Sequence, residues 1–379
     1  MNVSKNNMQS IKKATDLKGK KVIVRADFNV PISEKGKVLD VFRINSALPT
    51  IQFLQKKGAK IILISHIGRE PQESLKPVYE ILKKHFSLKF VPEIFGDKTN
   101  SAISLMKNGE VVMLENLRSD KGEKEGDKIF AKSLAKLGDV YVNEAFPVSH
   151  RADASIVLLP KLLPSYAGIQ LEKEVIELSK ALKPKHPFVF IQGGAKAETK
   201  IPLLKKYLKE ADCVFIGGEL ANDFYKQKGF NIGESKIDEV VPPLKLYLKN
   251  PKLILPETVV VLRDGKKQTV SISEVGVGES IFDVGLPSIH ILAEIIQKAK
   301  LILWNGPMGW YEGGYTKGTE EILKILADSK AQTIIGGGDT AVLVDRKKMS
   351  DKFTFVSTGG GATLEFLAKG TLPGIKALK

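Results

Sequence analysis

Short hydrophobic runs alternate with amphipathic segments along almost the whole chain. Runs that are hydrophobic throughout predict strands buried on both faces, and the amphipathic segments between them predict helices. The helical pattern is clearest at residues 44–59 and 318–331. Alternating strands and helices are typical of parallel sheets, so we expect an α/β fold. The expected strands, with the residues that follow them, are 22–29, 61–69, 111–118 and 140–151, then 188–196, 213–220, 301–309, 333–340 and 355–362.

The length of the chain predicts two domains, because 379 residues exceed what one hydrophobic core usually serves. We expect two Rossmann-like domains, each a mainly parallel sheet flanked by helices. The amphipathic stretch 166–182 is expected to form one hinge helix between them.

The residues at the strand ends differ between the two halves. Ligands of open α/β sheets bind beyond the carboxyl ends of the strands. The first half has polar side chains there: Asp27, Asn29, His66, Arg69, Arg118, His150 and Arg151. The second half has glycines there: Gly193–Gly194, Gly217–Gly218, Gly306, Gly336–Gly338 and Gly359–Gly361. Arginine suits carboxylate and phosphate groups, whereas exposed backbone before a helix suits a nucleotide and its phosphates.

The amino-acid composition excludes only a few classes of protein. The formal net charge of +15 suits either nucleic acid or a small polyanionic substrate. The lysines are scattered rather than clustered, which favours a solvated basic surface over a nucleic-acid groove. The single cysteine excludes an intrachain disulfide, and the five histidines lack metal-site spacing. With no hydrophobic run long enough for a bilayer and no secretory signal, we expect a cytoplasmic protein that does not bind membranes.

Two nucleotide-binding motifs are missing. The sequence has no GxxxxGK[ST] loop, which excludes a P-loop NTPase, and no GxGxxG after a strand, which weakens a dehydrogenase interpretation.

The motifs at the strand ends resemble those of phosphoglycerate kinases from about Leu17 to the C-terminal LPGIKAL. They are VRADFNVP (24–31), RINSALPTI (43–51), SHIGR (65–69), LENLR (114–118), VNEAF (142–146), HRADAS (150–155), PFVFIQGGAK (187–196), WNGPMG (304–309), IIGGGDTA (334–341) and STGGGA (357–362). The resemblance implies reversible transfer of a phosphoryl group between 1,3-bisphosphoglycerate and ADP, giving 3-phosphoglycerate and ATP with Mg²⁺. It also implies a monomer with a 3-phosphoglycerate domain at 1–168, onto which 366–379 packs back, and a nucleotide domain at 169–365.

The resemblance assigns the substrate side to the first half. Asp27 and Asn29 would contact the glycerate end, and Arg43 would be the catalytic arginine. The substrate phosphate would be surrounded by His66, Arg69, Arg118, His150 and Arg151.

The nucleotide side falls in the second half. Lys196 and Lys200 would meet the transferring and nucleotide phosphates, with Lys196 catalytic, and Asp339 would hold Mg²⁺. Gly359, Gly360 and Gly361 would donate backbone N–H groups to the moving phosphoryl group. The other nucleotide contacts would be Gly194, Gly217, Gly218, Asn305, Pro307, Glu312 (on the ribose), Gly337, Gly338 and Thr340.

Structural roles remain possible for single residues. Asp27 and Asn29 could form turns, His150 could be a core histidine, and Asp339 could cap a helix. The chain also departs from the family's usual residues at Asn45, Glu70, Ser119, Pro147–Val148, Leu286 and the segment 276–288. These departures bear on loop geometry and on the adenine pocket. Two alternatives therefore stay open: a nucleotide-binding relative without turnover, and a nucleic-acid-binding protein.

Overall fold

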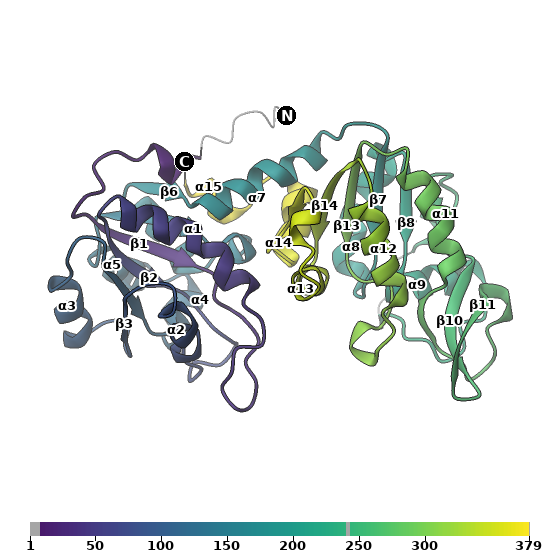
Figure 1. The fold of residues 1–379 in the computed structure, drawn as a ribbon, viewed down its shortest axis with the longest axis horizontal. Coiled ribbons are helices and arrows are strands. Elements are labelled where there is room, and N and C mark those ends of the chain that lie inside the picture. Colours follow the sequence, from purple (N-terminus) through teal and green to yellow (C-terminus); the bar gives the residue numbers. More distant parts are fainter. Residues whose placement is uncertain (1–7, 240–242, 379) are drawn as a thin grey trace. The chain divides into compact units, whose positions relative to one another are not determined.

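The computed structural model describes residues 8–239 and 243–378. These residues form two compact units, shown in Figure 1. The first unit runs to Ile176 and resumes at Lys369, and the second is Glu177–Ala368. Within the described residues, each unit is built on a six-stranded sheet in which every strand pair is parallel. The predicted α/β fold is confirmed.

The first unit has the strand order β3-β4-β2-β1-β5-β6. Its strands are β1 (Lys21–Ala26), β2 (Lys60–Ile64), β3 (Leu88–Val91), β4 (Val111–Leu114), β5 (Val140–Glu144) and β6 (Ser165–Ala167). Its α-helices are α1 (Phe42–Lys56), α2 (Lys76–Leu82), α3 (Asp97–Ser104), α4 (Lys121–Glu125), α5 (Lys128–Ala135), α6 (Ala154–Val157) and α15 (Pro373–Lys376), with α7 (Ile169–Ser179) extending into the second unit. Short 3₁₀ turns are η1 (Ile11–Lys13), η2 (Leu117–Ser119), η3 (Phe146–Val148) and η4 (Leu159–Lys161).

The second unit has the strand order β15-β14-β13-β7-β8-β9. Its parallel strands are β7 (Phe188–Gln192), β8 (Cys213–Ile216), β9 (Leu253–Ile254), β13 (Leu301–Asn305), β14 (Gln332–Gly336) and β15 (Phe355–Val356). Its α-helices are α8 (Ala197–Glu210), α9 (Gly218–Lys228), α10 (Lys245–Leu248), α11 (Leu286–Ile296), α12 (Lys317–Ala327), α13 (Gly338–Arg346) and α14 (Gly361–Lys369). Its 3₁₀ turns are η5 (Lys180–Leu182), η6 (Ile272–Glu274), η7 (Tyr311–Gly313) and η8 (Ser350–Lys352).

A small antiparallel sheet in the second unit was not predicted. It consists of β10 (Thr258–Arg263), β11 (Lys266–Ser271) and β12 (Ile281–Val284), in the order β11-β10-β12. Asp264 and Gly265, both with positive φ, connect β10 to β11, and the two strands form the hairpin at one end of this unit in Figure 1. The Asp-Gly turn is a sequence signal for such a hairpin.

The prediction of one helix over 166–182 is wrong at both ends. Tyr166 and Ala167 belong to β6, which pairs with β5, and α7 begins only at Ile169 and ends at Ser179. Gly168 lies between the strand and the helix. A Cβ at this position would lie 1.9 Å from a carboxylate oxygen of Glu144, so a larger residue would clash there. Pairing with the sheet therefore outweighs the helical periodicity of the first residues.

Glu144 and Thr50 hold the start of α7. The buried Glu144 carboxylate accepts the N–H groups of Gln170 and Leu171 at 3.1 and 3.2 Å. The Thr50 hydroxyl donates to Glu144 at 2.6 Å and accepts the N–H of Ile169 at 2.7 Å. Burial raises the pKa of Glu144 to about 7 despite these donors. Because the folded pKa exceeds that of the unfolded chain, this group's contribution to stability falls as the pH rises from about 4.5 towards 7.

We expect Thr50→Val to lower the free energy of unfolding by about 1–3 kcal/mol, because it leaves a helix N–H without an acceptor and takes a donor from a buried carboxylate. Urea unfolding at pH 7 measures the loss. Thr50→Ser keeps the hydroxyl and is the matched control. Equal stability of the two variants would show that the hydroxyl does not hold α7.

Candidate active site

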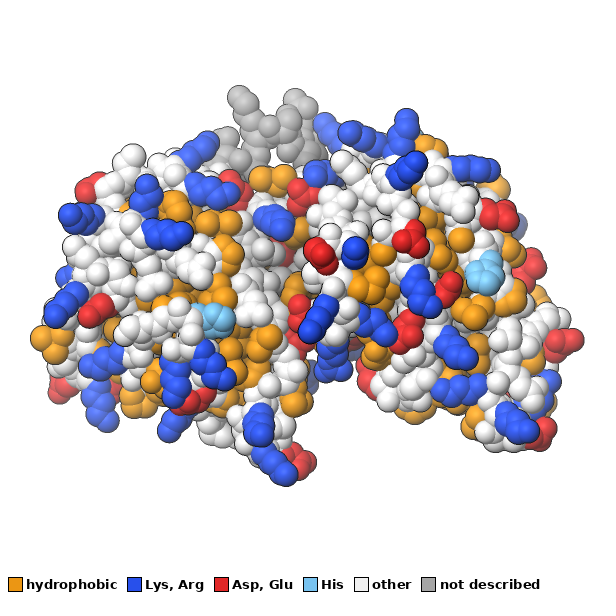
Figure 2. All heavy atoms as spheres, viewed as in Figure 1, with side chains coloured by type: hydrophobic (Ala, Val, Ile, Leu, Met, Phe, Trp, Pro, Cys, Tyr) orange, Lys and Arg blue, Asp and Glu red, His pale blue; other side chains and the backbone are white. Residues whose placement is uncertain are grey.

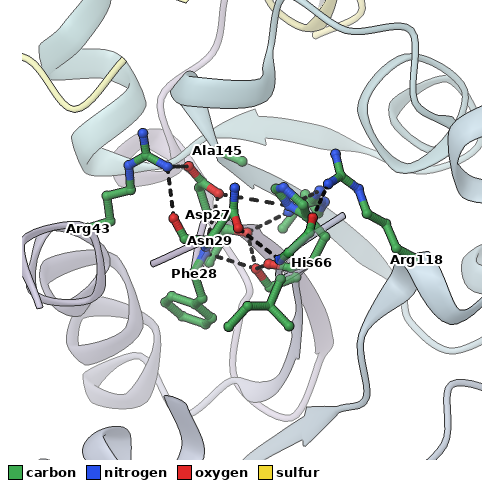
Figure 3. Close-up of polar contacts among 12 residues, drawn as sticks. Asp27, Phe28, Asn29, Arg43, His66, Arg118 and Ala145 are labelled. Carbon is green, nitrogen blue, oxygen red and sulfur yellow. Dashed lines mark hydrogen bonds and ion pairs between the residues drawn. The ribbon is translucent and has the colours of Figure 1, made fainter. Parts of the chain in front are cut away.

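The strand register brings the polar strand ends of the first unit to one edge. Ala26 at the end of β1 pairs with Glu144 at the end of β5, and Arg25 pairs with Ile64 at the end of β2. The segments that follow these strands carry Asp27 and His66 and meet at this edge, as Figure 3 shows.

Asp27, Asn29 and Arg43 contact one another. Arg43 Nη1 lies 3.1 Å from Asp27 Oδ2 and donates to the Asn29 carbonyl at 2.9 Å. The Asn29 side chain accepts the N–H of Gly68 at 2.9 Å, which links the loops after β1 and β2. Asp27 Oδ1 also accepts the Asn29 N–H at 3.3 Å, so the turn-forming role is present as well. The sequence pattern placed Arg43 just upstream of the helix. In the structure, Arg43 lies in the first turn of α1.

His66 is completely buried at this edge. Burial, with the positive charges of Arg25, Arg118, Arg151 and Arg43, holds its pKa well below the usual range, so the imidazole is neutral. Its Nδ1 lies 3.2 Å from Arg25 Nη2, and its Nε2 has no hydrogen-bond partner among the described residues.

The remaining predicted residues of this side lie on the following loops. Arg118 is buried, donates from Nη1 to the Gly68 carbonyl, and has a buried Nε without a partner in the described structure. Burial and the charge of Arg151 lower the pKa of Arg118, which places these two cations near each other. Arg69 is exposed, and His150 and Arg151 are half-buried after η3. The described contacts therefore join Asp27, Asn29 and Arg43, and place His66 and Arg118 beside them.

Pro147 does not disturb the loop before His150. It is the second residue of η3, where a backbone N–H would have no partner within the turn. The N–H groups of Val148 and Ser149 bond normally to the Ala145 and Phe146 carbonyls, at 3.2 and 3.0 Å.

The glycines of the second unit meet at the corresponding edge of its sheet. Gln192, Asn305 and Gly336 are aligned at the ends of β7, β13 and β14. A Cβ on Gly218 would lie 2.4 Å from the Gly194 nitrogen, and one on Gly306 would lie 2.5 Å from the Gly193 carbonyl oxygen. These glycines therefore allow the loops to touch backbone to backbone, a structural role that the sequence did not distinguish from ligand contact.

The Gly359–Gly361 segment is less crowded at its end, since a Cβ on Gly360 would lie 3.9 Å from the Gly338 nitrogen. Gly359 donates its N–H to the Ser357 hydroxyl at 3.1 Å, so it is already engaged. Gly361 starts α14, and no atom lies within 4 Å of a Cβ built on it. Gly360 and Gly361, which follow Gly359, are therefore the better candidates in this triplet for a ligand contact.

Lys200 lies on α8 beside Gly194. It is buried, and burial lowers its pKa to about 8, although Asp238, Glu219 and Asp339 partly counteract this. Lys196 precedes α8 with a positive φ of 66°. Asp238 accepts the N–H of Ala197, the first residue of α8.

A cavity of about 330 Å³ opens beside these loops. Of the predicted nucleotide residues it is lined by Gly194, Gly218, Pro307, Glu312 and Asp339. Nearby, the side chains of Asn305 and Thr340 are buried, and Asn305 Nδ2 and Thr340 Oγ1 have no hydrogen-bond partner in the described structure. Asp339 is the second residue of α13 and so does not cap it.

The sequence interpretation missed several cavity residues. Phe282, Asp283 and Val284 come from β12, and Trp310 follows the WNGPMG motif. Phe282 stacks on Trp310 and Tyr315, with ring centroids 5.9 and 4.4 Å away. The Asp-Gly hairpin signal could have revealed the sheet, but nothing in the pattern indicated that its third strand lines a cavity.

Charge is distributed broadly over the surface. Figure 2 shows Lys and Arg side chains mixed with acidic, polar and hydrophobic ones on the visible face. In residues 8–239 and 243–378 no three His, Cys, Asp or Glu side chains are grouped to bind a metal ion. None of the helices in the described part of the chain has the length and hydrophobicity that a membrane crossing requires.

Comparison with known proteins reveals the family. The family model described as phosphoglycerate kinase matches residues 11–370. The phosphoglycerate kinase of Leptospira biflexa is 42% identical over 382 residues, covering 96% of each chain. That of Chloroflexus aggregans is 39% identical over 388 residues, covering 96% of this chain and 97% of the relative.

Solved structures agree. The phosphoglycerate kinase of Pyrococcus horikoshii superposes with a TM-score of 0.88 at 30% identity, and that of Coxiella burnetii with 0.82 at 35%, each covering 98% of both chains. With this match along nearly its entire length, the chain belongs to the phosphoglycerate kinase family.

Proposed function

We propose that this chain transfers a phosphoryl group reversibly between 1,3-bisphosphoglycerate and ADP, giving 3-phosphoglycerate and ATP, as a step of glycolysis and gluconeogenesis. By its family it is a phosphotransferase with a carboxyl group as acceptor. The observation that carries the proposal is the pair of strand-end sites. One presents arginine and histidine side chains, and the other presents a cavity, a buried lysine and a glycine at the start of α14 that borders open space.

The first site would bind 3-phosphoglycerate. Asp27 and Asn29 would take its hydroxyl and carboxylate end. Arg69, Arg118, His150 and Arg151, with His66, would take its phosphate. The buried Nε atoms of Arg118 and His66 support this assignment, because a buried donor without an acceptor is costly unless a ligand supplies one.

The second site would bind the nucleotide. The cavity would receive the base and ribose between Gly217–Gly218 and Pro307, with Glu312 on the ribose. Lys196, Lys200, Asn305, Thr340 and the loops at Gly194 and Gly337–Gly338 would meet the phosphates. The unpartnered polar atoms of Asn305 and Thr340 support that placement.

The reaction needs no general base in this arrangement. The acceptor is a carboxylate in one direction and a nucleotide phosphate in the other, and both are ionised at neutral pH. Catalysis then consists of aligning two anions and neutralising the charge on the moving group. Arg43, Lys196, Gly360 and Gly361 would do this. Gly359 would contribute less than the resemblance implies, because its N–H already bonds to the Ser357 hydroxyl.

A magnesium ion fits the second site only together with the nucleotide. Asp339 is a carboxylate on the cavity wall at the start of α13, and the described residues offer no cluster that could hold the ion alone. Magnesium is often bound by one or two carboxylates plus substrate phosphates. When bound, it would offset negative charge on those phosphates.

We expect Asp339→Asn to weaken MgATP binding at least tenfold while leaving 3-phosphoglycerate affinity unchanged, because one carboxylate ligand is worth several charge-assisted contacts in this setting. Calorimetry with each ligand separately makes the comparison. Asp328→Asn, which lies beyond the end of α12, is the matched control. Normal MgATP affinity in Asp339→Asn would remove Asp339 from the metal site.

The two units are expected to close during the reaction. The acceptor and donor groups would be bound by different units, and direct transfer requires that they meet away from water. Small-angle scattering is expected to show a smaller radius of gyration only with 3-phosphoglycerate and nucleotide both present. The forward scattering also tests the expectation of a monomer. An unchanged radius in the ternary complex would contradict closure.

A coupled assay tests the function itself. Purified protein with 3-phosphoglycerate and MgATP is expected to release ADP, and omission of 3-phosphoglycerate is expected to abolish release. A chain that binds nucleotide without this turnover would be the non-catalytic relative. Binding of duplex DNA that falls steeply with salt would instead support a nucleic-acid partner. The cytoplasmic location expected from the sequence is tested separately, by cell fractionation.

A further inference from the structure

The contact between His66 and Arg25 determines where the imidazole carries its proton. His66 Nδ1 lies 3.2 Å from Arg25 Nη2. A guanidinium is always protonated in proteins and can only donate. Nδ1 must therefore accept this hydrogen bond, and a neutral ring then carries its proton on Nε2. Asp27 Oδ1 is 3.8 Å from the same nitrogen, too far to hold a proton there in competition.

All three nitrogens of the Arg25 guanidinium contact protein groups. It is completely buried in the middle of the first sheet. Its Nε donates to the Ser155 hydroxyl at 2.8 Å and its Nη1 to the Ala26 carbonyl at 2.6 Å. Its Nη2 also lies 3.5 Å from Glu123 Oε1. Arg25 is therefore occupied by protein groups and contributes through His66 rather than by touching a ligand.

Ser155 and Glu123 complete the chain of contacts. The completely buried Glu123 carboxylate accepts the Ser155 N–H at 2.9 Å and its hydroxyl at 2.6 Å. A hydroxyl has one proton, so Ser155 gives it to Glu123 and accepts from Arg25 Nε with a lone pair. With Glu123 ionised, the donors run in one direction, from Arg25 through Ser155 to Glu123.

We propose that Glu123, Ser155 and Arg25 are positioning residues that hold His66 as a neutral imidazole with its proton on Nε2, so that it offers the substrate phosphate a hydrogen-bond donor rather than a charge. This rests on the proposed function for the identity of the ligand. The Nε2 donor has no acceptor among the described residues, which leaves it for that ligand.

The surrounding charges favour the same state. Arg25, Arg43, Arg118 and Arg151 all oppose a positive charge on His66, and Asp27 is the carboxylate that faces it. A histidine that stays neutral provides the same donor at every pH at which the fold is intact. The site would then keep its affinity at a pH where a titrating histidine would change charge.

Nitrogen NMR of the wild-type protein tests the tautomer directly. The His66 ring signals are identified by their loss in His66→Gln. We expect the Nε2–H pattern with no titration near the usual histidine pKa, and a shift of the Nε2 signal when 3-phosphoglycerate is added. A proton on Nδ1, or protonation of the ring near the usual histidine pKa, would overturn the proposal.

Ser155→Ala tests the positioning role. Removing the hydroxyl takes away the acceptor of Arg25 Nε and one donor to Glu123, so the guanidinium is held less firmly. We therefore expect His66 to show mixed tautomers or to titrate. We also expect 3-phosphoglycerate affinity to fall about tenfold, equivalent to one charge-assisted hydrogen bond, while ADP affinity is unchanged. Ser104→Ala on the exposed end of α3 is the control. If Ser155→Ala changes neither the tautomer nor the affinity, or weakens affinity with the tautomer intact, the residue does not act through His66. If the wild-type protein binds no 3-phosphoglycerate, the proposed function fails while the tautomer result stands on its own.

Discussion

Replacing Arg43 with alanine is expected to lower kcat roughly 10³-fold, with a much smaller change in KM for 3-phosphoglycerate. Arginines that meet a transferring phosphoryl group contribute roughly 10³–10⁵ in rate. We expect the low end, because Lys196 and the N–H groups of Gly360 and Gly361 would remain. Arg43 Nη1 is held by Asp27 and the Asn29 carbonyl, and its other guanidinium nitrogens have no described protein partner. An interaction made mainly in the transition state lowers kcat and leaves ground-state affinity almost unchanged.

Two further variants test whether the loss of kcat comes from the guanidinium group itself. Arg43→Lys keeps a positive charge near Asp27 but lacks the planar fork, so we expect near-normal KM and poor recovery of kcat. Lys56→Ala removes an exposed cation from the other end of α1 and should behave as wild type. Steady-state kinetics decide the matter. A large rise in KM with kcat preserved would make Arg43 an ordinary substrate anchor.

Replacing Lys200 with methionine is expected to weaken nucleotide binding while making the protein more stable. Burial lowers the pKa of Lys200 to about 8, so keeping it charged at pH 7 costs folding free energy. Methionine has a similar shape without the charge. The free energy of unfolding should rise. The melting temperature should rise with it, by roughly 2–4 °C for each kcal/mol gained. ADP affinity should fall roughly 10–100-fold, the value of a hydrogen bond to a charged phosphate.

The pH dependence of stability distinguishes the loss of a buried charge from a general improvement in packing. In the wild type the unfolded chain holds the Lys200 proton more tightly than the folded protein, so wild-type stability rises as the pH goes from about 8 to 10.5. The advantage of Lys200→Met should therefore shrink over that range. Lys205→Met, at an exposed position on the same helix, is the control. A methionine variant less stable than wild type at pH 7 would show that the lysine charge stabilises the fold.

Strand positions could be predicted from the sequence because buried parallel strands are short, uniformly hydrophobic and followed by polar or glycine residues. The same rule located Asp27, His66 and the glycine loops at the correct edges. It could not locate Arg25 and Glu123. Arg25 is a charged residue within a strand, and Glu123 lies on a short helix distant in sequence, so only the folded sheet reveals their contact.

The errors in the sequence-based predictions also arise from contacts between segments that are distant in sequence. The start of α7 was misplaced because Tyr166 and Ala167 fit a helical period, yet pair with β5. The glycines at 194, 218 and 306 could not be told apart from those at 360 and 361. Both groups follow strands, but a Cβ on Gly218 or Gly306 would clash with neighbouring backbone at 2.4–2.5 Å, whereas one on Gly360 would lie 3.9 Å from the nearest backbone atom. That difference depends on atoms from three separate loops.

Isotope exchange between ADP and ATP tests most directly whether transfer is direct, between two anions held by cations and backbone, with no protein nucleophile. Labelled ADP is incubated with MgATP and the purified protein, without and then with 3-phosphoglycerate. We predict no label in ATP until 3-phosphoglycerate is added, and rapid exchange afterwards. Exchange in its absence would contradict the account, because it would require a phosphorylated form of the enzyme.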